Sequence, residues 1–175
     1  MRLIHLKTRL PPVVSLLKRN SDLESWEMDI PQSEADALFS ISKTFVSFSD
    51  LNLAPGIDVQ RELESSDGSE EFILDLRANA FRLTKYRYQN RARKILILAR
   101  LCIDGPAHTN PDGVSVGNTH LHTYREGYGD RFARAIDPDI FVDTMNRIET
   151  LRNFCAFCNI APLPAIVDIR SLVGP

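Results

Sequence analysis

The pattern of apolar and polar residues divides the chain into two helical segments with a run of strands between them. After Pro31, apolar residues recur at the spacing of an amphipathic helix of about four turns that extends to Phe48. A second helix is expected to begin at Asp137 and to continue to Cys158, with apolar residues along one side. Pro162 follows it and prevents it from continuing.

Between the helices, apolar and polar residues alternate in the manner of β-strands. The 94–104 segment is nearly continuous in apolar residues, which indicates a central strand covered on both faces. The expected fold class is therefore α+β: an antiparallel β-meander of about five strands flanked by an N-terminal and a C-terminal helix. A last short edge strand is expected at 166–169. The meander strands are expected at 57–63, 72–76, 81–89, 94–104 and 120–125.

Residues 1–29 differ in character from the rest and are predicted to form an N-terminal arm or extension. Residues 30–175 are predicted to form a single α+β domain, since this length can bury one core. No apolar run approaches the roughly 18 residues that a membrane span needs. The first residues also lack a continuous signal-peptide core, so a cytoplasmic location without membrane contact is expected.

The chain has three cysteines, an odd number without the spacing of a disulfide framework. Cys155 and Cys158 are three residues apart within the expected second helix. A zinc site would need a second pair of ligands, and none lies nearby in the sequence. We therefore expect these two thiols to be small buried apolar groups.

The net charge of -2 conceals a strong partition along the chain. Residues 21–76 carry fourteen acids and two basic residues, whereas residues 77–100 carry eight basic residues and no acid. Basic residues interleaved with tyrosines predict binding of RNA or another single-stranded nucleic acid. The acidic region could also shield the basic strand, within one chain or across a homodimer. The expected nucleic-acid-binding residues are Lys85, Tyr86, Arg87, Tyr88, Arg91, Arg93 and Lys94.

Three of the four histidines lie within residues 108–130. On a strand, His120, His122 and Tyr124 point to one face, while the residues between them point towards the helices. Arg100 on the central strand is expected on the same face as the histidines, and His108 is a reserve candidate. The expected catalytic residues are His120, His122, Tyr124, Arg100 and His108.

Metal-free acid–base cleavage of RNA is the leading hypothesis for this site. One neutral histidine would accept the 2′-hydroxyl proton, and a protonated histidine or tyrosine would serve the leaving oxygen. Arg100 would hold the phosphate. This hypothesis describes a metal-independent endoribonuclease of toxin type that uses no cofactor.

Two other interpretations of the same residues stay open. His-x-His on one strand face is a metal-ligand spacing, and His108, Asp112 or Glu126 would complete three protein ligands. Alternatively, the histidines and tyrosines belong to a solvated face or an interface. The protein would then be a non-enzymatic binding protein or inhibitor that acts on a protein or a nucleic acid.

The runs YRYQNRARK, HTNPDG and HLHTYREGYGD resemble a family of small bacterial and prophage-encoded proteins catalogued as a domain of unknown function. The resemblance covers about residues 30–165 and departs mildly at Arg131-Phe132, where the family has Lys-Trp. It implies no established activity. It points to mobile elements or host–phage conflict, a setting of ribonuclease toxins, of inhibitors and of cognate protein partners.

Overall fold

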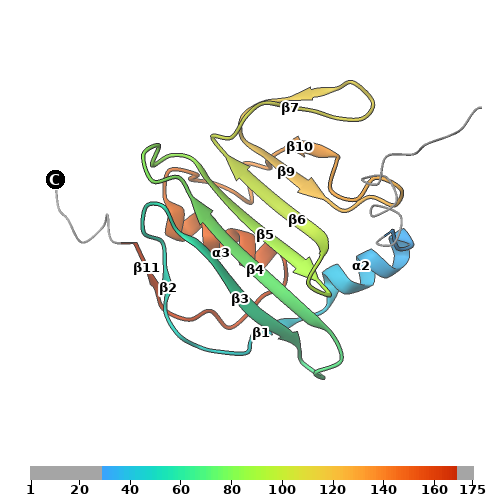
Figure 1. Cartoon of the computed structure of the whole chain (residues 1–175), viewed down its shortest axis with the longest axis vertical. Coiled ribbons are helices and arrows are strands. Elements are labelled where there is room, and N and C mark those ends of the chain that lie inside the picture. The colour runs from blue at the N-terminus through green and yellow to red at the C-terminus, as the bar shows by residue number, and fades with distance from the viewer. Residues whose placement is uncertain (1–28, 169–175) are drawn as a thin grey trace, which may run out of the picture.

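The computed structural model describes residues 29–168, so the predicted N-terminal arm lies outside the described residues except for Asp29. Its centre is a seven-stranded sheet in which every neighbouring pair of strands is antiparallel. Figure 1 shows helix α3 (Arg147–Phe157) against one face of this sheet and helix α2 (Gln32–Ser40) at one end of it. In spatial order the strands are β1 (Lys43–Phe45), β3 (Asp58–Ser65), β4 (Glu71–Ala78), β5 (Tyr86–Ala92), β6 (Leu96–Ile103), β9 (His120–Thr123) and β10 (Ala133–Ala135).

Two small sheets complete the fold. β7 (His108–Thr109) pairs with β8 (Ser115–Val116) in a hairpin that connects β6 to β9. β2 (Leu51–Asn52) pairs in parallel with β11 (Ile166–Val167), the short strand expected near the end of the chain. The α+β prediction is confirmed, because strands β3 to β6 form consecutive hairpins and the two helices precede and follow the meander.

The first helix is shorter than the sequence predicts. It ends at Ser40, and residues Lys43–Phe45 form the edge strand β1. Phe45 lies opposite Leu63 of β3, and both side chains are buried. The helical spacing of Ile41, Phe45 and Phe48 was therefore misleading, since pairing with a strand distant in sequence decides the local structure.

The second helix begins ten residues later than the sequence predicts. Asn146 is its N-cap, and the Asn146 side chain accepts a hydrogen bond from the Glu149 backbone N–H. The preceding residues form turns, in which Asp137 and Asp143 accept hydrogen bonds from backbone N–H groups two residues ahead. Aspartate side chains compete with helical hydrogen bonds in this way, which explains the late start.

The sheet has an inner face, which packs against α3, and an outer face on the other side. On the inner face the rings of Tyr88 and Phe154 contact each other, with centroids 6.1 Å apart. Cys155 and Cys158 are fully buried in this core, and burial raises the pKa of the Cys155 thiol to about 12. The prediction that both thiols are buried apolar groups is confirmed. Neither helix of residues 29–168 has the length and apolar character to cross a membrane.

Candidate functional site

Strand pairing brings the chemically active residues together on the outer face. The register of β6 and β9 places Cys102 opposite His120 and Arg100 opposite His122. On the next strand, Arg87 of β5 lies opposite Cys102. The prediction that His120, His122 and Arg100 share a face is therefore confirmed.

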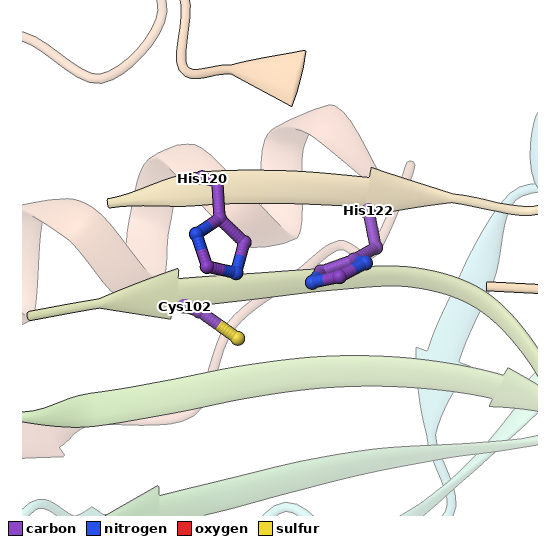
Figure 2. Close-up of side chains that lie close together, drawn as sticks. All are labelled: Cys102, His120 and His122. Atoms are coloured by element: carbon purple, nitrogen blue, oxygen red, sulfur yellow. The ribbon is translucent and has the colours of Figure 1, made fainter. Parts of the chain in front are cut away.

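Three imidazole rings form a compact group that we call the histidine cluster: His108, His120 and His122. The ring centroids of His120 and His122 are 4.8 Å apart, and the His108 ring lies 4.8 Å from that of His122 and 5.6 Å from that of His120. Figure 2 shows His120 and His122 on β9 beside Cys102 on β6. His108 comes from the β7–β8 hairpin and contacts both rings, and His120 and His122 are only 3% and 1% exposed.

Each histidine of the cluster donates one ring N–H to a backbone carbonyl. His120 Nδ1 lies 2.7 Å from the Gly117 oxygen, and His122 Nδ1 lies 2.8 Å from the Asp130 oxygen. His108 Nε2 lies 2.8 Å from the Arg131 oxygen. A carbonyl oxygen only accepts, so the nitrogen in each contact carries the proton. The nitrogens that these hydrogen bonds leave unused are Nε2 of His120 and His122 and Nδ1 of His108.

Arg100 lies between the cluster and an acid. Its Nη1 is 2.8 Å from the Asp130 carboxylate, and its Nη2 is 3.2 and 3.3 Å from the two ring nitrogens of His122. A donor aligned with the lone pair of one ring nitrogen would be much farther from the other nitrogen. The guanidinium nitrogen therefore lies over the face of the His122 ring and leaves the in-plane lone pair of Nε2 free.

Burial and the neighbouring charge keep both strand histidines neutral. Burial, followed by the Arg100 charge, lowers the pKa of His122 to about 3. Burial also lowers the pKa of His120. Neutral imidazoles with free lone pairs can act as bases or as metal ligands, but His122 cannot supply a proton at neutral pH.

Cys102 is the member of this site that sequence reasoning missed. One potential ligand atom from each of Cys102, His120 and His122 lies within 4.8 Å of the others. Asp112 and Glu126, the acids considered as ligands, are elsewhere engaged: they accept hydrogen bonds from the backbone N–H groups of Val114 and Gln32. The sequence signal for Cys102 was its position two residues after Arg100 on one strand, which places both side chains on the same face. Only the register of β6 and β9 shows that Cys102 lies opposite His120.

Tyr124 is not part of the histidine cluster. Its hydroxyl donates to the Asp29 carboxylate at 2.6 Å and accepts from the Ile30 backbone N–H at 2.8 Å. Burial and Asp29 raise the pKa of this hydroxyl to about 12. In the structure Tyr124 therefore anchors the segment that enters α2, rather than lying free beside the histidines to support a phosphate.

The two tyrosines of the basic segment, residues 77–100, lie in the core. Tyr86 and Tyr88 are on the inner face, and their hydroxyls donate to the carbonyls of Thr144 at 2.6 Å and Arg147 at 3.1 Å. These side chains point to the side of the sheet that α3 covers, away from the histidines. A ring in this position cannot stack on a nucleic-acid base.

Most basic residues of the basic segment form ion pairs with acidic residues. Arg91 forms a bidentate pair with Asp75 at 2.7 and 2.9 Å, and Arg93 pairs with Glu70 at 2.7 Å. Lys94 lies 3.8 Å from Glu71. The acidic region thus shields the basic strand within one chain, one of the two arrangements considered from the sequence. Within residues 29–168, Lys85 and Arg87 remain without an acidic partner.

A second basic surface, absent from the sequence predictions, lies on the connection from β9 to β10 and on β10 itself. We call it the basic edge: Arg125, Tyr128, Arg131 and Arg134, all exposed. The Arg125 guanidinium lies 4.2 Å from the centroid of the Phe132 ring, which packs against Tyr128. The glycines beside Tyr128 have φ of 76° and 58°, as the tight turn requires. The sequence signal for this surface is the run REGYGDRFAR, in which three arginines and one phenylalanine flank the Gly-Tyr-Gly turn.

Comparison with known proteins places the chain in one family. Searches of curated proteins and of solved structures find no match. A family model described as a family of unknown function, DUF6978, matches residues 30–160, which is most of the chain. The protein therefore belongs to the DUF6978 family.

Proposed function

We propose that the protein binds single-stranded RNA and that the basic edge contacts the phosphate backbone. The observation that carries this proposal is the distribution of charge after ion pairing. Arg125, Arg131 and Arg134 are exposed and have no acidic partner among residues 29–168. Unpaired arginines beside an exposed aromatic ring are typical of surfaces that bind single strands.

The local surroundings of the basic edge support an anionic ligand. Asp130 lies on the same connection, but its carboxylate is held by Arg100 at 2.8 Å. Glu126 accepts a hydrogen bond from the Gln32 backbone N–H at 2.8 Å. Tyr128 is 41% exposed, and the part of its ring that Phe132 and Arg125 do not cover would contact a base. Phosphates would meet three arginines, and a base would meet a ring.

Binding is better supported than metal-free cleavage. Acid–base cleavage needs one proton donor and one acceptor that both reach the substrate. His120 and His122 are both buried, and the pKa of His122, about 3, leaves its imidazole neutral at neutral pH, so it is not a protonated acid. We retain the RNA-directed part of the hypothesis. A bacterial or prophage setting, with a role in host–phage conflict, belongs to the proposal as well.

The test is fluorescence anisotropy of a labelled single-stranded RNA over a salt series. Each phosphate contact to a single strand contributes about 0.7 to the slope of log K against log salt. Removing the three arginines as Arg125→Gln, Arg131→Gln and Arg134→Gln should weaken binding and lower the slope by roughly 2.

The matched control removes three arginines whose charges are held in ion pairs with Asp58, Asp104 and Glu70. This variant has the same net charge as the test variant and should bind RNA more tightly than it. Tyr88→Phe should leave the affinity unchanged, because this ring is buried. Equal losses in the two triple variants would refute the proposal. The control variant is Arg77→Gln, Arg82→Gln and Arg93→Gln.

A further inference from the structure

We propose that Cys102, His120 and His122 bind a transition-metal ion of the zinc type, with His108 as the fourth ligand. This site is independent of the RNA proposal, since no residue of the basic edge supplies a ligand. One thiol and two imidazole nitrogens lie within 4.8 Å of one another. In a tetrahedral zinc site, ligand atoms at 2.0–2.3 Å from the metal are about 3.3–3.7 Å apart. Closure on a metal therefore needs side-chain movements of about 1 Å.

The sheet holds these ligands in place. Cys102 and His120 are directly opposite each other on hydrogen-bonded strands, and His122 is the next outward-facing residue of β9. Figure 2 shows the two imidazoles and the thiol gathered over the same stretch of the two strands. A site built on paired strands requires little ordering of the backbone when the metal binds.

The hydrogen bonds of the three histidines match those of metal ligands. A ligating histidine almost always donates its other ring N–H to a carbonyl or carboxylate, which fixes the ring and the tautomer. His120, His122 and His108 each donate one N–H to a backbone carbonyl, at 2.7–2.8 Å. The opposite nitrogen of every ring is free to bind a metal. Three independent imidazoles share this arrangement.

Arg100 leaves the site accessible to a cation. Its guanidinium lies over the face of the His122 ring, so it does not occupy the in-plane lone pair of Nε2. Asp130 offsets its charge at 2.8 Å. Binding of the metal would release the Cys102 proton, and the thiolate would contribute a second compensating negative charge.

The ligand types select the metal. Thiolate and imidazole suit zinc and cobalt, whereas magnesium and calcium require oxygen ligands. No carboxylate belongs to the three-residue group among residues 29–168. His108 comes from the β7–β8 hairpin, and its ring is as close to His122 as His120 is. The metal would thus join this hairpin to the sheet.

Cobalt(II) titration of the metal-stripped full chain tests the proposal, because a cobalt–thiolate bond gives a charge-transfer absorption. The wild type should bind one equivalent with this absorption, and zinc should displace the cobalt. Cys102→Ser should lose the thiolate absorption, and His120→Asn should weaken binding at least about 100-fold. His108→Ala should keep the thiolate absorption and change the visible ligand-field bands. Unchanged bands in that variant would refute His108 as the fourth ligand.

Cys155→Ala is the control, because it removes a thiol of the Cys155–Cys158 pair and keeps every proposed ligand. It should retain the absorption. Loss of the absorption in Cys155→Ala, with its retention in Cys102→Ser, would place the metal at the cysteine pair and overturn the proposal. Thermal unfolding gives a second readout, since zinc should raise the melting temperature of the wild type but not of Cys102→Ser. No binding by the folded wild type would also overturn the proposal.

Discussion

Lys43 joins the ends of both helices to the edge strand β1. Its side chain is fully buried, and Nζ donates to the carbonyls of Phe39 at 3.0 Å, Ile41 at 2.8 Å and Cys158 at 3.0 Å. These carbonyls lie at the C-terminal ends of α2 and α3, where helical hydrogen bonding runs out. A cation is favourable at this end of a helix. Replacing Lys43 with Met keeps an unbranched apolar chain as far as Cε and removes the Nζ donor.

The expected cost combines two opposing terms. Three buried carbonyls that lose their partner cost about 1–3 kcal/mol each. Burial lowers the pKa of Lys43 from 10.5 to about 8, which corresponds to about 3 kcal/mol of desolvation at 1.36 kcal/mol per unit. Met avoids that desolvation cost. The difference predicts that Lys43→Met lowers the free energy of unfolding at pH 7 by about 3 kcal/mol.

Urea unfolding of wild type and Lys43→Met between pH 7 and pH 10.5 measures this effect. Between about pH 8 and 10.5 the folded state holds fewer protons at Lys43 than the unfolded state does. The stability that Lys43 contributes therefore rises with pH across this range, and is lower below pH 8. The difference between wild type and variant should grow by up to about 3 kcal/mol.

Lys94→Met is the matched control, because Lys94 is exposed and only 3.8 Å from an equally exposed Glu71. This variant should change the stability by less than about 0.5 kcal/mol. A Lys43→Met protein as stable as the wild type at pH 7 would refute the reasoning. It would show that well-packed apolar atoms can replace the three hydrogen bonds without loss.

Two further predictions concern the charges of the sheet. Asp75→Ala leaves the Arg91 guanidinium, which is 16% exposed, without its bidentate partner and should lower the free energy of unfolding in urea by about 3 kcal/mol. The double variant Asp75→Leu with Arg91→Met should recover most of this stability. A double variant as unstable as the single one would contradict the prediction. Because the acids shield the basic strand within the chain, light scattering should give the same mass at low and high salt, and a dimer that dissociates at high salt would contradict the intramolecular arrangement.

The sequence predicted the meander well and the helix boundaries poorly. Alternating side chains and short turns are local signals, and they identified the strands β3, β4, β5, β6 and β9 and the shared face of His120 and His122. The short strands β7, β8 and β10 were not predicted. The end of α2 is decided by the pairing of Phe45 with Leu63, a contact between residues far apart in the chain. A helical spacing of apolar residues contains no information about such a partner strand.

The sequence predicted only part of the candidate site, because local patterns do not show how distant strands pair. Strand alternation placed Arg100 with the histidines, but Cys102 became a neighbour of His120 only through the register across a long connection. The period of two also shows that Tyr86 and Tyr88 share a face. It does not show which face of the sheet α3 covers. That face decides whether the two tyrosine rings are exposed and able to stack on a base or are buried in the core.

The histidine cluster and the basic edge are physically connected through the backbone. The carbonyls that accept from His122 and His108 belong to Asp130 and Arg131, on the connection that carries the arginines. A metal that fixes these two rings would therefore also fix the backbone beside Arg131. If both proposals hold, any change in RNA affinity caused by zinc must be matched by an equal change in zinc affinity caused by RNA. On both proposals, the hydrogen bonds from His122 and His108 would help to hold the backbone of the proposed RNA-binding surface in place.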